Sequence, residues 1–202
     1  WETDFHPRRI YHVSQNATNA SNDNDDSERA PFKTISKAAS ILVAGEAVEV
    51  HEGTYREWVK PENGGTAPAE MIWYYAAKGE KVVIKGSDEW KPQWVKTRYV
   101  GNVPNRAFVT YEATLKGSQF EGANPFCLLN GRIDSDWGYN KEFEHCRGMM
   151  FLGGEKLRQV SKYEDLQQVT PQDVGLFWVE ENGMTIHVRL QSDRDPNGLT
   201  FE

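Results

Sequence analysis

Residues 30–39 read Ala-Pro-Phe-Lys-Thr-Ile-Ser-Lys-Ala-Ala, and residues 47–55 read Ala-Val-Glu-Val-His-Glu-Gly-Thr-Tyr. The first stretch predicts a short amphipathic helix, because apolar side chains recur on one face at helical spacing. The second predicts a short strand over 47–50 that breaks at a Gly-Thr-Tyr corner, where glycine permits a sharp turn. A helix that closes the end of a stack of strands, followed by a first coil, predicts a mainly β protein with a right-handed parallel β-helix.

Further short strands are expected around this stretch, at residues 9–13, 71–75, 82–84 and 107–111. Glycine and proline residues between them mark turns of uneven length. Short apolar strands a few dozen residues apart suit a solenoid better than a meander. A β-sandwich with uneven loops would give a similar periodicity, so this pattern alone does not separate the two folds.

The second half of the chain differs from the first in composition and periodicity. From about residue 117 it is rich in glycine, asparagine, aspartate and aromatic residues, with little periodicity. Two hairpins are then predicted, one over 148–160 with a Gly-Gly tip and one over 176–190 with an Asn-Gly turn. Successive hairpins indicate an antiparallel unit.

Three segments are therefore predicted. Residues 1–114 form β-helix coils with a capping helix, residues 115–195 form an inserted antiparallel β module, and residues 196–202 begin a further coil. A stack that stopped there would expose apolar core and an unpaired edge. We therefore expect the chain to be the N-terminal part of a longer protein, the alternative being a tail that returns to cap its own stack.

The composition of the chain limits the classes of partner that are expected. The net charge of −7 and a pI of about 5.3 disfavour nucleic acid as a partner. Aromatic residues make up 12% of the chain, including 7 tryptophans, which suits a neutral sugar because pyranose faces stack on aromatic rings. No apolar run approaches the roughly 20 residues that cross a bilayer, so no membrane span is expected.

Two groups of residues are predicted to bind substrate. Trp90 and Trp94 lie in a polar loop after a coil strand, where an exposed indole would stack on a sugar and a covered one would only protect the flank. Asp136, Trp137 and Tyr139 combine a carboxylate with aromatic rings in one glycine-containing loop, for which a structural Asx-turn loop is the alternative. His145 could reach a subsite nearby, or be a structural histidine.

No metal ligand is assigned from the sequence, since no cysteine or paired-histidine spacing indicates zinc. The polar loop over 15–29 could hold Ca²⁺ through hard oxygen ligands, although its spacing is not that of an EF-hand and a solvated turn is the alternative. Its acidic residues are Asp23, Asp25, Asp26 and Glu28. Cys127 and Cys146 could form one disulfide or stay as buried thiols. Residues 51–55 are interpreted as a structural corner.

Several of these segments resemble a known group of proteins. Residues 11–14 (Tyr-His-Val-Ser), 30–35, 48–55 and 79–87 resemble the opening of right-handed parallel β-helix carbohydrate-active proteins. Residues 124–126, 148–157 and 177–190 look like a β-sandwich module that interrupts the β-helix in β-xylosidase-type glycoside hydrolases. The opening is shared by lyases and hydrolases, so it specifies the fold better than the reaction.

The resemblance implies a secreted, periplasmic or cell-surface retaining hydrolase of plant-type glycans such as xylosides. Retaining enzymes use two carboxylates about 5 Å apart. In that family both lie on later coils, and no position here matches either, so the catalytic residues are unknown and this chain would supply scaffold and part of the substrate wall. Trp90 matches the place of an aromatic residue at the family's substrate pocket.

Two other functions stay open at this point. A β-helix polysaccharide lyase would need a lysine or arginine base, usually with Ca²⁺, and the acidic balance of the chain counts against it. A non-catalytic carbohydrate-binding surface protein could use the same scaffold. The expected partner is an oligo- or polysaccharide, and the chain could also pair with a second copy or with the remainder of a longer protein. No organic cofactor is expected.

Overall fold

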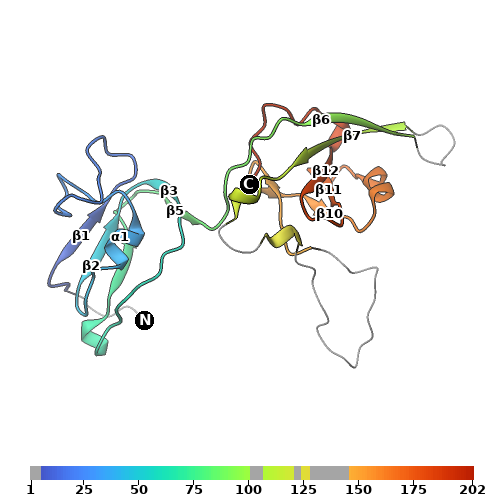
Figure 1. The fold of residues 1–202 in the computed structure, drawn as a ribbon. Helices are drawn as coiled ribbons and strands as arrows, with labels where there is room; N and C mark the ends of the chain where they lie inside the picture. Colours follow the sequence, from blue (N-terminus) through green and yellow to red (C-terminus); the bar gives the residue numbers. More distant parts are fainter. Residues whose placement is uncertain (1–5, 101–106, 121–123, 128–145) are drawn as a thin grey trace, which may run out of the picture. The chain divides into compact units, whose positions relative to one another are not determined.

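The computed structural model describes residues 6–100, 107–120, 124–127 and 146–202. The chain divides into two compact units, Trp1–Asp88 and Glu89–Glu202. Most regular structure in both units is β-strand, which confirms the prediction of a mainly β protein (Figure 1). In the described part of the chain, no helix combines the length and the apolar character needed to cross a bilayer.

The first unit contains two parallel ladders. β1 (Ile10–Val13), β2 (Ala47–Val50) and β4 (Trp73–Ala76) form one sheet in the order β1-β2-β4. β3 (Gly53–Arg56) pairs in parallel with β5 (Val82–Lys85) in another. Along the chain β2 is followed by β3, and β4 is followed by β5, so each of these two passages of the chain adds one strand to each ladder. The strands predicted in this unit are confirmed, and β3 occupies the stretch that had been interpreted as a corner.

The predicted helix is confirmed as α1 (Ile35–Ala39). Thr34 caps it, since its hydroxyl accepts a hydrogen bond from the backbone N–H of Lys37. The Glu57 carboxylate accepts two more from the N–H groups of Ile35 and Ser36, at 3.0 and 2.7 Å. The helix packs on the strands, because its buried residues belong to the same core as those of β1, β2 and β3. That core contains Tyr11, Val13, Phe32, Ile35, Ala38, Leu42, Val48, Val50 and Tyr55.

The second unit is organised around a five-stranded sheet in the order β10-β11-β12-β7-β6. Its strands are β6 (Val95–Val100), β7 (Ala107–Thr114), β10 (Arg158–Gln159), β11 (Gly175–Val179) and β12 (Thr185–Leu190). β10 and β11 are parallel, and the other neighbours are antiparallel. Both predicted hairpins are present: β11 and β12 form one, and β8 (Phe151–Leu152) pairs with β9 (Glu155–Lys156) around the Gly-Gly tip in the other.

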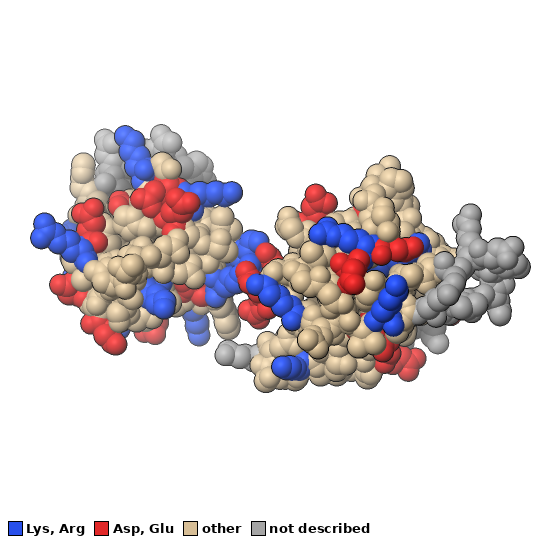
Figure 2. Space-filling model, turned by 90° about the horizontal axis from the view of Figure 1, so that it is seen from above, with Lys and Arg blue, Asp and Glu red and all other residues tan. Residues whose placement is uncertain are grey.

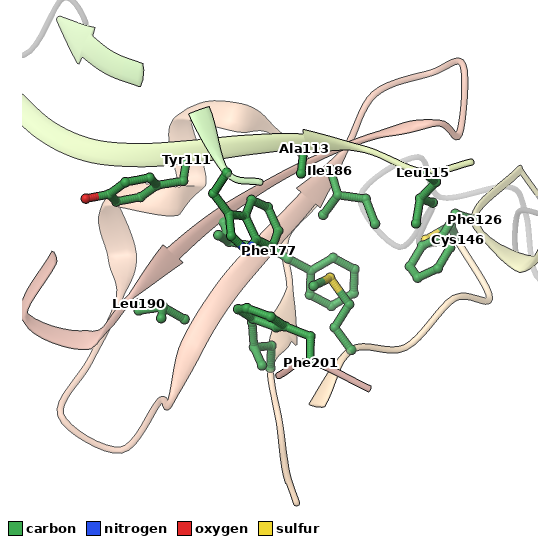
Figure 3. Packing of buried hydrophobic residues seen from close by; sticks show 13 residues of the cluster. Tyr111, Ala113, Leu115, Phe126, Cys146, Phe177, Ile186, Leu190 and Phe201 are labelled. Atoms are coloured by element: carbon green, nitrogen blue, oxygen red, sulfur yellow. The ribbon is translucent and has the colours of Figure 1, made fainter. Parts of the chain in front are cut away.

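Both faces of the five-stranded sheet are covered. On one face Tyr111, Phe177 and Ile186 belong to the main core of the unit, which Figure 3 shows. On the other face Phe108 and Leu176 pack with Leu166 from the 3-10 helix η5 (Tyr163–Gln168). Each of β7 and β11 contributes residues to both of these clusters, because neighbouring side chains of a strand point to opposite faces.

The place of residues 107–111 differs from the prediction. They were expected to form a strand of the solenoid, with coils extending to residue 114. Instead β7 lies antiparallel to β12, with Tyr111 opposite Val188, so the division between the units falls after Asp88. The short apolar run has the same appearance in either setting, and its antiparallel partners, β6 on one side and β12 on the other, distinguish the two settings.

The last residues also pack differently from the prediction of a further coil. Phe201 is completely buried in the core of the second unit. It pairs with Trp90 through two backbone hydrogen bonds of 2.8 and 3.0 Å, and it also forms a bridge with Leu152. The beginning and the end of this unit therefore lie side by side.

Candidate functional site

A hollow of about 680 Å³ in the second unit lies beside Trp90. Its wall is formed by the loop that follows Trp90, the start of β6, the end of β7 and the start of β12. The lining residues are Trp90, Lys91, Pro92, Gln93, Val95, Glu112, Ala113, Thr114, Lys116, Gln119 and Thr185. The prediction singled out only Trp90 in this set.

The orientation of Trp90 is fixed by two other aromatic rings. Its ring centroid lies 5.1 Å from that of Trp94 and 6.5 Å from that of Phe201, with the planes close to perpendicular in both pairs. The backbone of Trp90 is also fixed, because it pairs with the backbone of Phe201. Trp90 is thereby half-buried, with its indole held at the wall of the hollow.

The polar groups of the hollow can donate and accept hydrogen bonds. Lys91 and Lys116 bring ammonium donors, Thr185 brings a hydroxyl, and Glu112 brings an acceptor. Together with an indole, this set suits a ligand that has one apolar ring face and hydroxyls around its rim. Glu112 is the single carboxylate among the described lining residues, so the hollow does not hold the two carboxylates of a glycosidase.

A histidine lies behind Glu112. His187, opposite Glu112 in the β7–β12 ladder, is buried, and its Nε2 is 2.9 Å from Glu180 Oε1. Its Nδ1 lies 3.6 Å from Glu112 Oε2, beyond hydrogen-bond distance, and has no hydrogen-bond partner among the described residues. Glu112 thus lines the hollow and also lies close to a buried imidazole.

The burial of Trp94 does not agree with the prediction that it stacks on a sugar. Only 5% of the residue is exposed, and its ring contacts Trp90 and Phe201. Asn197 binds both the backbone N–H and the backbone C=O of Trp94, at 2.9 and 3.2 Å. Trp94 is a core residue because segments more than a hundred positions later in the chain cover it.

The remaining predicted substrate residues lie outside the described part of the chain. They are Asp136, Trp137, Tyr139 and His145. Their assignment stays a prediction.

The two cysteines are free thiols in this structure, so the predicted alternative of a disulfide is not formed. Cys127 is exposed, whereas Cys146 is buried in the main core of the second unit. Burial raises the pKa of the Cys146 thiol, because the charged thiolate is poorly solvated there.

The acidic loop predicted as a calcium candidate is held by its own contacts. Asp26 is only 7% exposed and is paired with Arg9, and burial raises the pKa of its carboxyl. Asp25 accepts a hydrogen bond from the backbone of Ser27. Within the described residues, a group of three converging metal-binding side chains occurs elsewhere, at His12, Glu49 and His51 of the first unit.

Charged side chains of both signs are interspersed on the described surface. Figure 2 shows lysine and arginine next to aspartate and glutamate on both units. The net charge of −7 is thus spread out on this face and not concentrated in one field.

Comparison with known proteins gives one extensive likeness. XylC, whose structure was solved in complex with xylose, is 31% identical with a TM-score of 0.74 over 95% of this chain, which spans 31% of the XylC chain. No family model matches the sequence. The uncharacterized protein YwoF of Bacillus subtilis (strain 168) is 34% identical over 68 residues, covering 34% of this chain and 14% of YwoF. The chain therefore spans less than a third of either protein.

A second solved structure gives no usable alignment. The GH136 lacto-N-biosidase from Eubacterium ramulus is 20% identical over 34% of this chain and 12% of its own, with a TM-score of 0.29. A score that low carries no argument about fold or function.

Proposed function

We propose that this chain is the N-terminal part of a secreted retaining glycoside hydrolase that acts on plant-type glycans such as xylosides. The observation that carries the proposal is the likeness to XylC, which was solved with xylose and which aligns with 95% of this chain. The two catalytic carboxylates then belong to coils outside this chain, in agreement with a hollow that has one carboxylate.

The proposed scaffold is a right-handed parallel β-helix. Two in-register parallel ladders in the first unit, each extended once per passage of the chain, support this assignment. The helix α1 would close the end of the stack, since it packs into the core formed by β1, β2 and β3.

The second unit is proposed to be a β-sandwich-like module inserted into this solenoid. An insertion needs its first and last residues close together, so that the host fold continues undisturbed. The backbone pairing of Trp90 with Phe201 meets that need. We propose that the insertion begins near residue 89 instead of 115 and includes Phe201, because β6 and β7 belong to its sheet and Phe201 belongs to its core.

The hollow beside Trp90 is proposed to be part of the sugar-binding wall. The half-buried indole offers a surface for the face of a pyranose, and the polar side chains around it offer partners to hydroxyls. Asp136, Trp137, Tyr139 and His145 are proposed to contribute to the same glycan site.

A polysaccharide lyase is the second candidate, favoured by one observation. Lys91 and Lys116 both line the hollow, and a lyase needs a basic side chain to abstract a proton and to face uronate carboxylates. The net charge of −7 counts against a polyuronate partner.

Hydrolysis of a panel of nitrophenyl glycosides tests the proposal. Xyloside and arabinoside are offered to the 202-residue chain and, in parallel, to the longest protein that its gene encodes. We expect release of nitrophenol by a longer protein and none by this chain. Release by this chain alone would place the carboxylates within it, and cleavage of pectate with calcium but of no glycoside would favour the lyase.

A further inference from the structure

Three metal-binding side chains meet on the outer face of the first unit. His12 lies on β1 directly opposite Glu49 on β2, and His51 follows the last residue of β2. The neighbours of His12 and Glu49 in their strands are buried in the core. Because alternate side chains of a strand point to opposite faces, the register itself places His12 and Glu49 together on the side away from that core.

The distances between the ligand atoms match those around one metal ion. His12 Nδ1 lies 3.4 Å from His51 Nε2 and 3.9 Å from Glu49 Oε1, and one ligand atom from each of the three residues lies within 4.8 Å of the other two. With metal–nitrogen bonds of about 2.0–2.1 Å, two ligands of a tetrahedral ion are about 3.4 Å apart. The nitrogen pair already has this spacing, and the Glu49 oxygen lies 3.9 Å from His12 Nδ1, slightly farther than a shared ion requires.

His51 has an outer partner that orients its ring. Its Nδ1 is 3.2 Å from Glu80 Oε1, and the other oxygen of Glu80 accepts a hydrogen bond from the backbone N–H of Glu52 at 2.6 Å. A carboxylate fixed in this way favours a proton on Nδ1 of His51, which leaves the lone pair of Nε2 facing His12. Carboxylate–histidine pairs of this kind are the usual support of histidine ligands.

Glu49 also has a partner beyond the three ligands. Tyr75 on β4 lies opposite Glu49 in the next pair of the ladder and shares a hydrogen bond with it. A carboxylate only accepts hydrogen bonds, so the Tyr75 hydroxyl is the donor to Glu49. The row His12, Glu49, Tyr75 therefore crosses three neighbouring strands with its polar groups supported.

We propose that His12, Glu49 and His51 bind one divalent transition-metal ion, with zinc as the representative ion. Two imidazoles and one carboxylate are a ligand set for zinc, cobalt, nickel or copper, whereas Ca²⁺ and Mg²⁺ prefer oxygen ligands throughout. Three protein ligands leave a fourth position for water. The ion would join β1 to β2 and so fasten the first strand of the ladder to the second.

The alternative is a metal-free arrangement in which His12 and His51 only share a hydrogen bond. The stacked geometry of the two rings, 5.7 Å between centroids and 22° between planes, would be compatible with either state. The two states differ in one measurable property, which is saturable binding of one ion that depends on Glu49 as well as on both histidines.

Isothermal titration of the untagged chain with zinc tests the proposal. We expect one equivalent to bind, and His12→Gln, Glu49→Gln and His51→Gln each to weaken binding by more than the roughly 10- to 100-fold that loss of an outer partner costs. Glu80→Gln should weaken it within that range. The matched control is His6→Gln, an exposed histidine of the same unit, which should bind as the parent does.

Two further measurements distinguish loss of a metal ligand from loss of the fold in a variant. Circular dichroism without metal shows which variants keep their fold. Cobalt, titrated into the parent chain, should give the intense visible absorption of a four-coordinate site. Absence of zinc binding by the parent chain, equal binding by the parent and Glu49→Gln, or the weak spectrum of hydrated cobalt would each overturn the proposal.

Discussion

The two units differ in how they bring polar side chains together. In the first, parallel strands stack in register, so residues from passages far apart in sequence line up in a row, as His12, Glu49 and Tyr75 do. In the second, the hollow is assembled from a loop and the ends of three strands around Trp90. Strand register thus determines which residues meet in the candidate metal site, whereas the packing of a loop against strand ends determines which residues line the candidate sugar site.

The units also differ in how their cores are assembled. The core of the first contains residues from α1 and the nearby strands, all from the first 55 positions apart from partly buried neighbours. The core of the second joins Trp94 and Tyr111 to Phe177 and Phe201, so it depends on contacts across the whole unit (Figure 3). Separate cores predict separate unfolding transitions, and the variants below test that separation.

Phe201→Ala should have the largest effect. The side chain is completely buried and contacts both Trp90 and Trp94, so its removal should lower the free energy of unfolding of the second unit by about 3–5 kcal/mol. Urea unfolding followed by tryptophan fluorescence measures this. Met149→Ala, at an exposed position, is the control. A loss of the same size in the first unit would contradict the separation of the cores.

Leu42→Ala is the counterpart in the first unit. Leu42 is completely buried in the core beneath α1, and its truncation should cost about 2–5 kcal/mol. Hydrogen exchange, resolved by peptide, should show faster exchange in β1 and β2 and unchanged exchange in β11 and β12. Ile41→Ala, at an exposed neighbouring position, should change neither.

Asp173→Asn tests an ion pair of the second unit. Both guanidinium nitrogens of Arg158 that bind Asp173 lie within 3.0 Å of it, and they hold the pKa of that carboxyl well below its usual range. A lowered pKa in the folded state gives stability that is full at neutral pH and is lost as the pH falls below about 5. The variant should lose about 1–3 kcal/mol at pH 7 and show less acid sensitivity in pH-dependent unfolding. Equal acid sensitivity would contradict this assignment.

Thr34→Ala should have the smallest effect. It removes the side-chain acceptor at the start of α1 and should cost about 1 kcal/mol, because Glu57 still accepts from two of the first N–H groups. Thermal unfolding of the first unit measures the change. Thr34→Ser, which keeps the hydroxyl, should restore most of the stability, and failure to do so would show that the cap is not the cause.

The parts of the fold that depend on local patterns were predictable. The strands at β1, β2, β4 and β5, the helix α1 and the two hairpins follow from apolar spacing and turn residues. The assignment of β7 was not predicted. Its sequence neighbour β6 was not recognised as a strand, and its other partner, β12, begins at Thr185, far along the chain. A short apolar strand does not reveal whether its neighbour is parallel or antiparallel.

The candidate sites likewise depend on contacts between distant residues, which the sequence does not reveal. Trp90 and Trp94 look alike in sequence, yet Asn197 and Phe201 bury Trp94 and leave Trp90 at the hollow. Residues 51–55 read as a structural corner in the sequence. The candidate role of His51 as a metal ligand follows from the strand register that sets His12 beside Glu49.

Binding of xylo-oligosaccharides, measured by titration of the chain and two tryptophan variants, tests whether the hollow beside Trp90 is a sugar site. We expect Trp90→Ala to weaken binding by roughly 2- to 10-fold, as loss of about 0.5–1.5 kcal/mol of aromatic contact implies. Trp58→Ala, at a residue 85% exposed in the first unit, should bind like the parent chain. Equal binding by the parent and Trp90→Ala, or no binding by any of the three, would contradict a sugar site at this hollow.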